Sequence, residues 1–309
     1  MIYCTLLNPS IDCLYTLDQF RSGSTYVDTK SMTVPAGKGL NVARVVSSLG
    51  EKVCIRGLVP VSNFEQVTSF VDHLAIEADL MPVDGSLRIN TTIIESSNGA
   101  VTHINSTGSC LTESIQYEFE RHFKKGLQQG DIYCMSGSLP QGFTNDTYGS
   151  LIRYCKEAGC QVMLDSRNDA LQMGIRAKPH MIKPNLDELE EYFAEQIRGV
   201  HHIALKAKRF LDMGIEYTFI SLGEDGMIAV HGNDCLLCNA PRVNAKDTVG
   251  CGDALVAGLL VAMQRQFSFS EMCRLAVACG TSKALHKGPG VIDSNEVWQL
   301  MEDVEITAV

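Results

Sequence analysis

The sequence is poor in aromatic residues and carries no excess of positive charge. Aromatic residues make up 7% of the 309 residues, and 26 Lys and Arg stand against 36 Asp and Glu, for a formal net charge of −10. Such a chain lacks the broad basic surface that attracts nucleic acid or an anionic membrane. No apolar run approaches the roughly 20 residues of a membrane span, and no basic segment followed by a long apolar run opens the chain. We therefore expect a cytoplasmic protein that binds neither nucleic acid nor membrane.

Paired metal-binding motifs are also missing, although the chain has 12 cysteines. Cys235 and Cys238 form a single CxxC without a second pair or a nearby histidine pair, so a zinc site is not favoured. Others, such as Cys4, Cys134 and Cys279, lie inside apolar runs, where a reduced thiol behaves as a small hydrophobic group. We interpret the cysteines as reduced structural residues.

The sequence does contain a regular alternation of strand-like and helix-like segments. Short apolar runs occupy 1–7, 53–58, 131–135 and 161–165, and amphipathic segments occupy 64–74, 112–128 and 145–158. This alternation predicts an α/β fold with a mainly parallel sheet, helices on both of its faces and right-handed crossovers. There is no internal repeat, low-complexity tract or linker rich in Pro, Gly or Ser.

A second set of strands interrupts this alternation. Segments 13–34 and 87–105 are extended and partly alternating, and Ser97-Asn98-Gly99 between two β-branched runs is a strong hairpin signal. Their outer face is mostly polar. We therefore expect a small separate β-sheet that forms a lid beside the main core.

The most informative stretch is Asp-Thr-Val-Gly-Cys-Gly-Asp, from Asp247 to Asp253. It precedes an uncharged apolar run, 254–263, which predicts a buried helix. The glycines then fall in the first helical turn, where backbone N–H groups are unpaired and the helix dipole favours a phosphate. Asp253 would repel that phosphate unless it acts as a base that takes a proton from a substrate hydroxyl. A glycine-rich helix cap with a favourably placed acid is the structural alternative.

Polar residues also follow the first strand and begin the first helix. Asp12 comes after the strand, at the sheet edge where open α/β folds bind ligands, although an Asx turn explains it too. Gly37 and Gly39 would let the backbone and Lys38 approach a ligand, and Asn41 lies on the first helical turn. A capped helix start with a solvated lysine is the alternative.

Three further positions suit a phosphate that the substrate already carries. Arg88 is a cation in a lid strand, with Asn90 two residues further on, and arginine suits bidentate phosphate recognition. Ser138 follows a strand in the string Ser-Gly-Ser-Leu-Pro. A surface arginine and an ordinary strand-to-helix turn are the alternatives.

Asn185 and Glu188 are three residues apart at the start of a helix, so both can face one ligand. A carboxylate beside nucleotide phosphates requires a hard cation, and magnesium held partly through water meets this need. From the residue types alone, an acid-rich helix start stabilised by the helix dipole is the better explanation.

Together these segments resemble the PfkB, or ribokinase-like, carbohydrate kinases, in particular their phosphofructokinase and tagatose-6-phosphate kinase branch. The likeness extends over nearly the whole chain, through Asn8–Asp12, Gly37–Asn41, Arg88–Asn90, Ser136–Pro140, Lys183–Glu188 and Asp247–Asp253. The sequence departs from the family pattern at Ala36, where glycine is usual, and at Cys251, where alanine is usual. The resemblance implies a single ribokinase-like domain over 1–309, with three α/β/α layers and a lid that can mediate homodimerisation.

The resemblance also implies roles for individual residues. Asp253 would be the catalytic base, and Gly250, Cys251 and Gly252 would form an anion hole through their backbone N–H groups. The substrate would be bound by Asp12, Gly37, Lys38, Gly39, Asn41, Arg88, Asn90 and Ser138. ATP would be bound by Lys183, Asn185, Ser221, Gly223, Gly226, Thr248, Ala278 and Cys279, and magnesium by Asn185 and Glu188.

These observations support the hypothesis of an ATP-dependent, magnesium-requiring kinase that converts a ketohexose monophosphate to its bisphosphate. Fructose 1-phosphate and tagatose 6-phosphate both fit, and the sequence does not separate them. Two alternatives stay open. One is a ribokinase-like kinase of an unphosphorylated sugar or nucleoside, and the other is a non-catalytic sugar-phosphate sensor.

Overall fold

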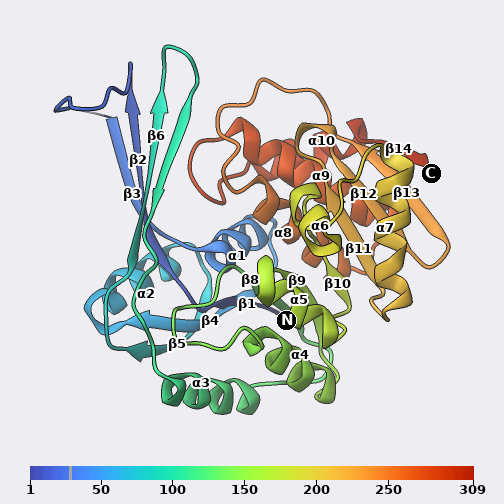
Figure 1. Ribbon diagram of the computed structural model, residues 1–309, viewed down its shortest axis with the longest axis horizontal. Coiled ribbons are helices and arrows are strands. Elements are labelled where there is room, and N and C mark those ends of the chain that lie inside the picture. The colour runs from blue at the N-terminus through green and yellow to red at the C-terminus, as the bar shows by residue number, and fades with distance from the viewer. Residues whose placement is uncertain (28–29) are drawn as a thin grey trace.

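The centre of the protein is a ten-stranded sheet, seen in a computed structural model that describes residues 1–27 and 30–309 (Figure 1). In spatial order its strands are β14 (Glu305–Ala308), β13 (Asp234–Asn239), β12 (Met227–His231), β11 (Tyr217–Ser221), β10 (Met181–Ile182), β9 (Gln161–Asp165), β8 (Ile132–Ser136), β1 (Ile2–Leu6), β4 (Val53–Pro60) and β5 (Glu77–Val83). Neighbours from β5 to β11 pair in parallel, whereas β12, β13 and β14 are antiparallel. The predicted mainly parallel sheet is confirmed.

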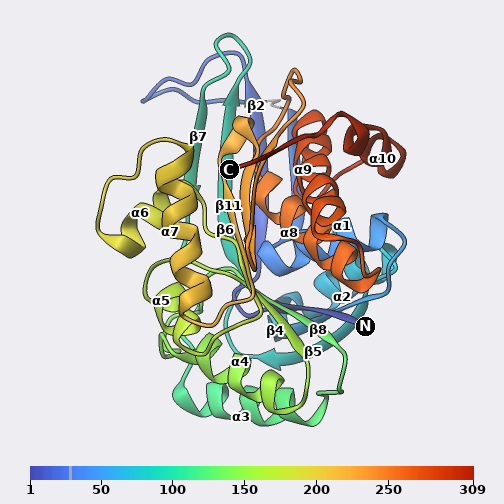
Figure 2. The ribbon, with the colours of Figure 1, turned by 90° about the vertical axis from the view of Figure 1, so that its right-hand side faces the viewer.

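Helices cover both faces of this sheet, so the protein has three layers (Figure 2). One face carries α1 (Lys38–Ser48), α2 (Phe64–His73), α8 (Cys251–Gln264), α9 (Phe269–Leu285) and α10 (Ser294–Asp303). The other carries α3 (Glu113–Lys125), α4 (Thr147–Glu157), α5 (Asn168–Arg176), α6 (Leu186–Phe193) and α7 (Val200–Asp212). Short 3₁₀ turns are η1 (Val61–Asn63) and η2 (Gly223–Asp225). Of the helices in the described part of the chain, none is long and apolar enough to cross a membrane.

Alternate residues of the central strands point to opposite faces of the sheet, and this creates two hydrophobic cores. Cys4 of β1 packs in the core that α1 and α8 cover, whereas Tyr133 of β8 packs in the core on the other face. Strands that are buried on both faces form continuous apolar runs, which is why 1–7 and 131–135 show no polar alternation. Cys235 and Cys238 of β13 lie in different cores, so the two thiols cannot bind one ion.

A four-stranded sheet projects from one end of the molecule (Figure 1). Its order is β3 (Lys30–Ala36), β2 (Ser10–Leu17), β6 (Arg88–Glu95) and β7 (Val101–Asn105). The predicted hairpin of β6 and β7 is confirmed. β2 begins at Ser10, earlier than the expected 13, and pairs with β6 in parallel. Asp12 therefore lies on a strand and not in a turn, while Asp28 and Thr29, within the expected segment 13–34, lie outside the described residues.

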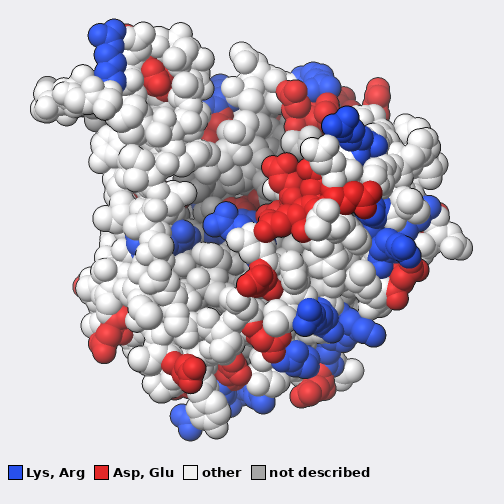
Figure 3. Space-filling model, in the orientation of Figure 1, with Lys and Arg blue, Asp and Glu red and all other residues white. Residues whose placement is uncertain are grey.

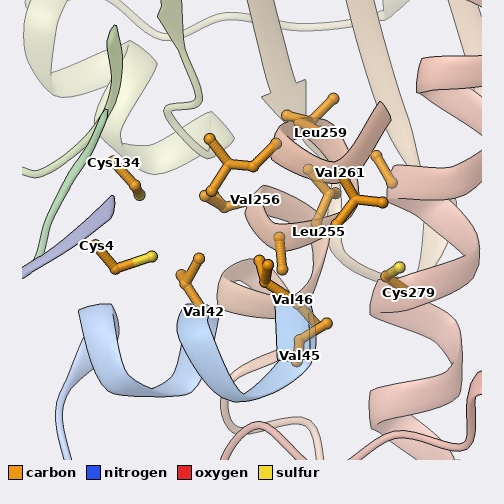
Figure 4. Close-up of a cluster of buried hydrophobic side chains, with 14 of the residues drawn as sticks. Cys4, Val42, Val45, Val46, Cys134, Leu255, Val256, Leu259, Val261 and Cys279 are labelled. Carbon is orange, nitrogen blue, oxygen red and sulfur yellow. The ribbon is translucent and has the colours of Figure 1, made fainter. Parts of the chain in front are cut away.

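Helix α8 runs through the core beside α1 and α9. Figure 4 shows Val256 and Leu259 of α8 in the same cluster of buried side chains as Val42 of α1. A Cβ on Gly258 would lie 2.7 Å from the Ala276 Cα, so this glycine permits the close approach of α9. The predicted buried helix is confirmed, and its residues from 253 to 262 are all buried.

The order of the strands creates a ligand-binding edge. β1 lies between β4 and β8, so the chain builds the sheet on one side of β1 and then on the other. Ligands bind at such reversals, beyond the carboxyl ends of the strands. The segments that follow β1, β8, β9 and β10 meet at this edge, and they contain several of the candidate site residues.

Candidate active site

A cleft lies between the small sheet and the carboxyl edge of the main sheet. It is lined on one side by Asp12, Leu14 and Val34 and on the other by Asp247, Val249 and Gly288. Figure 3 shows a hollow between the small sheet and the main body, with basic side chains at its floor and acidic side chains gathered over α6 beside it. The small sheet and the Asp247–Asp253 segment therefore face each other.

Asp253 lies in the first turn of α8, where only 6% of the residue is exposed. The Nδ2 of Asn41, on the first turn of α1, donates a hydrogen bond of 2.8 Å to its Oδ2. Among the described residues, none donates a hydrogen bond to Oδ1. The structure thus joins two segments that lie 212 residues apart in the sequence, and it leaves one carboxylate oxygen able to accept from a ligand.

Asp165, at the carboxyl end of β9, joins two lysines. Its Oδ2 lies 3.0 Å from the Nζ of Lys38, and its Oδ1 lies 3.3 Å from the Nζ of Lys183. The side chains of Asp165 and Lys183 are buried, whereas that of Lys38 is 40% exposed. Lys38 can therefore contact a ligand while Asp165 holds it in place.

The neighbouring charges decide the protonation of these groups. Burial acts to raise the pKa of Asp165, but the ammonium groups of Lys183 and Lys38 outweigh it and hold the pKa below its ordinary value. Desolvation acts to lower the pKa of Lys38, yet Asp165, Asp253 and Glu188 raise it overall. Burial raises the pKa of Asp253, which Lys38 opposes only in part. An ionised network therefore lies beside a carboxyl group with an increased proton affinity, the property of a general base at neutral pH.

Positive charge flanks the N-terminus of α8. A Cβ on Gly252 would lie 3.7 Å from the Lys183 Nζ, so this ammonium is next to the first-turn N–H groups. Gly250 is the N-cap residue with φ of 85°, a left-handed conformation that favours glycine. Burial raises the pKa of the Cys251 thiol to about 11, so the thiol stays neutral. An anion at this point would meet the helix dipole and the lysine together.

Asp12 and Asn90 lie side by side on the face of the small sheet that lines the cleft. The Ser10 hydroxyl and the Asn90 amide each donate a hydrogen bond of 2.8 Å to the Asp12 Oδ1. The Oδ1 of Asn90 is buried without a partner. Buried polar atoms are seldom unpaired, and a ligand hydroxyl is the kind of group that would satisfy this one.

Arg88 and Ser138 are connected through Asn8. The Arg88 Nε donates to the Asn8 carbonyl at 3.1 Å, and the Asn8 amide donates to the Ser138 hydroxyl at 3.1 Å. Desolvation lowers the pKa of Arg88, but a guanidinium stays charged at neutral pH. Its two terminal nitrogens have no acceptor among the described residues, so they are available to an anionic ligand.

Asn185 and Glu188 form a capping box at the start of α6. The Glu188 N–H donates to Asn185 Oδ1 at 2.7 Å, and the Asn185 N–H donates to Glu188 Oε2 at 2.9 Å. This reciprocal cap explains the spacing of the pair and leaves Glu188 Oε1 for another ligand. Asn185 also bridges to Ser221 of β11. Gly223 and Gly226, with φ of 63° and 97°, form the turn that follows this strand.

The structure corrects two of the predicted contacts and places three others. Ala278 and Cys279 of α9 have no accessible surface and belong to the core, so neither side chain reaches a nucleotide. Gly39 is required for packing, because a Cβ there would lie 1.9 Å from a carbonyl oxygen of β1. Gly37 is the buried N-cap residue of α1, and Thr248 is exposed beside the start of α8.

Two connecting residues escaped the site prediction. Asp165 ends an apolar strand at the ligand-binding edge, and this position could have marked it as a site residue. Nothing in the neighbouring sequence shows that it pairs with two lysines. Lys283 interrupts the apolar pattern of α9, but the sequence around it does not indicate which residue it pairs with. Asp165 pairs with Lys38 and Lys183, and Lys283 pairs with Asp247, and residue type and spacing do not reveal such long-range ion pairs.

Comparison with known proteins decides the family. A family model described as pfkB family carbohydrate kinase matches residues 7–295. The chain belongs to the pfkB family of carbohydrate kinases. It is therefore a phosphotransferase that acts on a sugar hydroxyl, with ATP as its phosphoryl donor.

Relatives of this pfkB-family kinase align along almost its whole length. A 1-phosphofructokinase from Vibrio cholerae is 31% identical over 303 residues, which cover 98% of this chain and 95% of the relative. A tagatose-6-phosphate kinase from Staphylococcus epidermidis is 29% identical, with 100% of both chains covered. Among solved structures, Escherichia coli phosphofructokinase-2 in complex with potassium has a TM-score of 0.92, 23% identity and 98% coverage of each chain. The expected ribokinase-like fold is confirmed.

The substitution Asp165→Asn in this pfkB-family kinase should lower the free energy of unfolding by about 3 kcal/mol, because it leaves the buried Lys183 ammonium without a counter-charge. Urea denaturation at pH 7 measures this loss. The native pKa of Asp165 is lowered, so its stabilisation is present above the ordinary carboxyl pKa of about 4 and is lost as pH falls through the native value. The difference between the two proteins should therefore shrink below about pH 4.

Asp146→Asn is the matched control for this measurement. Asp146 pairs with Arg153 at 2.6 Å, but 42% and 48% of the two side chains are exposed. Exposed pairs contribute roughly 0–1 kcal/mol. Equal losses of stability in the two variants would contradict a charge-compensating role for Asp165.

Proposed function

We propose that this kinase phosphorylates a ketohexose monophosphate to the bisphosphate, with fructose 1-phosphate and tagatose 6-phosphate as candidate substrates. The observation that carries the proposal is the half-buried Arg88, which lies on the same face of the small sheet as Asp12 and Asn90 and whose terminal guanidinium nitrogens have no acceptor among the described residues. An acidic chain that binds an anionic sugar needs such locally placed cations. The names of the relatives, 1-phosphofructokinase and tagatose-6-phosphate kinase, point to the same substrate class.

Asp253 acts as the general base in this proposal. Asn41 holds its Oδ2, so Oδ1 can accept the proton of the reacting hydroxyl. The raised pKa of Asp253 makes its carboxylate a better base. The sugar oxygen then attacks the γ-phosphorus of ATP, the bond from that phosphorus to the bridging oxygen breaks, and ADP leaves.

Negative charge that spreads over the transferring group is stabilised from two sides. The N–H groups of Gly250 and Gly252 at the start of α8 have no acceptor among the described residues, whereas that of Cys251 donates to the Thr248 carbonyl at 3.3 Å. The buried Lys183 lies next to these groups. Lys38 faces the cleft, and its ion pair with Asp165 fixes its position. These groups are in place before the reaction, which avoids the cost of reorganisation.

A magnesium ion fits beside Glu188 if the nucleotide phosphates and water supply most of its ligands. The free Oε1 of Glu188 is a hard oxygen, and the described residues contain no group of three His, Cys, Asp or Glu that could hold an ion. This donor set suits an ion that keeps water and phosphate oxygens as ligands. Bound there, magnesium would neutralise phosphate charge. Lys183, Asn185, Ser221, Gly223, Gly226 and Thr248 stay the predicted nucleotide contacts.

We also propose that two copies associate through the outer face of the lid, the four-stranded sheet of β3, β2, β6 and β7. Ile89 and Ile104 are 53% and 58% exposed. Ile104 pairs with Thr91, so both isoleucines lie on the face opposite Asp12 and Asn90. Exposed apolar groups on one face favour association. A structure of Escherichia coli phosphofructokinase-2 is described as a tetrameric inhibited form. A cytoplasmic location stays a prediction.

The substitution Asp253→Asn should lower kcat by roughly 10²- to 10⁴-fold, because an amide cannot take the proton of the hydroxyl. Binding of the sugar phosphate should change little, since the side chain keeps its shape. A coupled ADP-release assay measures kcat, and calorimetry measures binding. In the wild type, the rate should fall as pH falls through the raised pKa of Asp253, because only the ionised form is a base.

Cys251→Ala is the matched control, since it changes the neighbouring residue while keeping the backbone N–H. Its kcat should equal that of the wild type, because the thiol is neutral. Wild-type turnover in Asp253→Asn would remove the base assignment. The absence of sugar-dependent ADP release from the wild type would favour a sugar-phosphate sensor.

The substitution Arg88→Gln should lower kcat/KM for the phosphorylated substrate by roughly 10- to 150-fold, since a charge-assisted hydrogen bond contributes about 1.5–3 kcal/mol. Activity on free fructose, which carries no phosphate, should hardly change. The ADP-release assay should compare fructose 1-phosphate, tagatose 6-phosphate, fructose 6-phosphate and free fructose.

Arg153→Gln is the control for Arg88→Gln, because Arg153 is an exposed arginine paired with Asp146. It should leave kcat/KM unchanged for every sugar. Higher wild-type activity on an unphosphorylated sugar or nucleoside than on any sugar phosphate would refute the phosphosugar proposal and favour the neutral-sugar alternative.

Substitution of both Ile89 and Ile104 by Asp should convert a dimer to a monomer, because it places charge on an apolar contact face. Size-exclusion chromatography with light scattering measures the mass. Leu205→Asp, at a 60% exposed leucine of α7, is the control and should keep the wild-type mass. A monomeric wild type, or a doubly substituted protein that stays dimeric, would contradict association through the lid.

A further inference from the structure

Lys283, in the last turn of α9, is a lysine with no accessible surface. Its Nζ lies 3.2 Å from Asp247 Oδ2, 3.1 Å from the Asp247 carbonyl oxygen and 3.0 Å from the His286 carbonyl oxygen. The three donors of an ammonium group are thus matched by three oxygens, one of them charged. Burial of an ammonium is costly without such partners, so this is an organised cation site.

The site ties the end of α9 to the segment that precedes α8. The Asp247 carboxylate accepts from the Val249 N–H at 3.0 Å and from the Gly288 N–H at 2.9 Å, in addition to its contact with Lys283. The Lys246 N–H donates to the Ala284 carbonyl at 2.7 Å. Lys283 therefore connects the turn after α9 to the segment around Asp247, which leads into Gly250, the N-cap residue of α8.

The side chain of Lys283 lies directly beneath that N-cap. A Cβ on Gly250 would lie 3.8 Å from the Lys283 Cε and 3.9 Å from the Asp253 Oδ2. A side chain at position 250 would therefore contact both the lysine stem and the candidate base. A shift of the ammonium would shift the Asp247 backbone, and with it the first N–H groups of α8.

We propose that Lys283 is a built-in cation that positions the loop from Asp247 to Gly250 for phosphoryl transfer. This inference rests on the proposed reaction at the start of α8. Lys283 is a positioning residue, because it is buried beneath the loop. Two carbonyl oxygens and a carboxylate are also ligands that potassium or ammonium accepts. Since the chain supplies this ammonium covalently, the kinase needs no free monovalent cation.

The decisive variant is Lys283→Ala, assayed in potassium, ammonium or tetramethylammonium chloride at equal ionic strength. The wild type should have the same kcat in all three salts. Lys283→Ala should lose roughly 10- to 100-fold in kcat, the order expected from misplaced reacting groups, with little change in the sugar KM. Potassium or ammonium, but not the bulky tetramethylammonium, should restore activity. The same two ions should raise the melting temperature of the variant alone.

Lys283→Met is the companion variant, because its stem fills the cavity and should prevent rescue by a small cation. Lys287→Ala removes an exposed lysine from the following turn and should behave as the wild type. A wild type that requires potassium or ammonium would overturn the proposal, whether or not the variants fold. So would a Lys283→Ala enzyme with unchanged kcat, or a loss of kcat and stability that neither ion restores.

The failure of this inference can be told apart from failure of the proposed function. If the substrate class is wrong, the wild type shows no turnover of sugar phosphates in any salt. The cation-dependent melting of Lys283→Ala would still appear, because it depends on the oxygens around the cavity and not on the sugar.

Discussion

Compensation of buried charge at the carboxyl edge of the main sheet is the constraint on which the site depends. Asp165 is paired with Lys38 and Lys183, and Lys283 is paired with Asp247. Removing one partner from such a buried pair costs several kcal/mol, about 3–5 in measured cases. The pairs therefore fix α1, β9, α9 and the segment before α8 relative to one another. Burial among these groups raises the pKa of Asp253, and Lys38 opposes this rise only in part.

The two sheets supply different parts of the site. The main sheet contributes the elements that surround the start of α8, where positive charge and unpaired N–H groups coincide. The small sheet contributes Asp12, Asn90 and Arg88, which suit a polyhydroxylated anion. The chain is acidic overall, yet basic side chains lie at the floor of the hollow in Figure 3. Local placement, and not net charge, therefore decides what the cleft can bind.

Local patterns account for the parts of the protein that could be predicted. Strand and helix periodicities predict the three layers, and the Asn-Gly turn predicts the hairpin of the small sheet. The uncharged run after Asp253 predicts α8, since only a buried helix accommodates such a segment. The shared family signatures also predict that Asn41 and Asp253 belong to one site, and the structure joins them by a hydrogen bond of 2.8 Å. Residue type and spacing carry this information because each strand, helix, hairpin turn and signature motif is complete within a short segment of the chain.

Periodicity and motifs along the chain thus establish the fold class, the buried helix and the carboxylate at its start, whereas the pairing of distant charges follows only from how the elements pack together. Nothing near Lys38 indicates Asp165, which lies 127 residues away, and nothing near Lys283 indicates Asp247. The core position of Cys279 likewise depends on which helices cover α9. Such contacts are set by the docking of separate elements, and a single sequence records periodicity within an element but not the partner that an element meets.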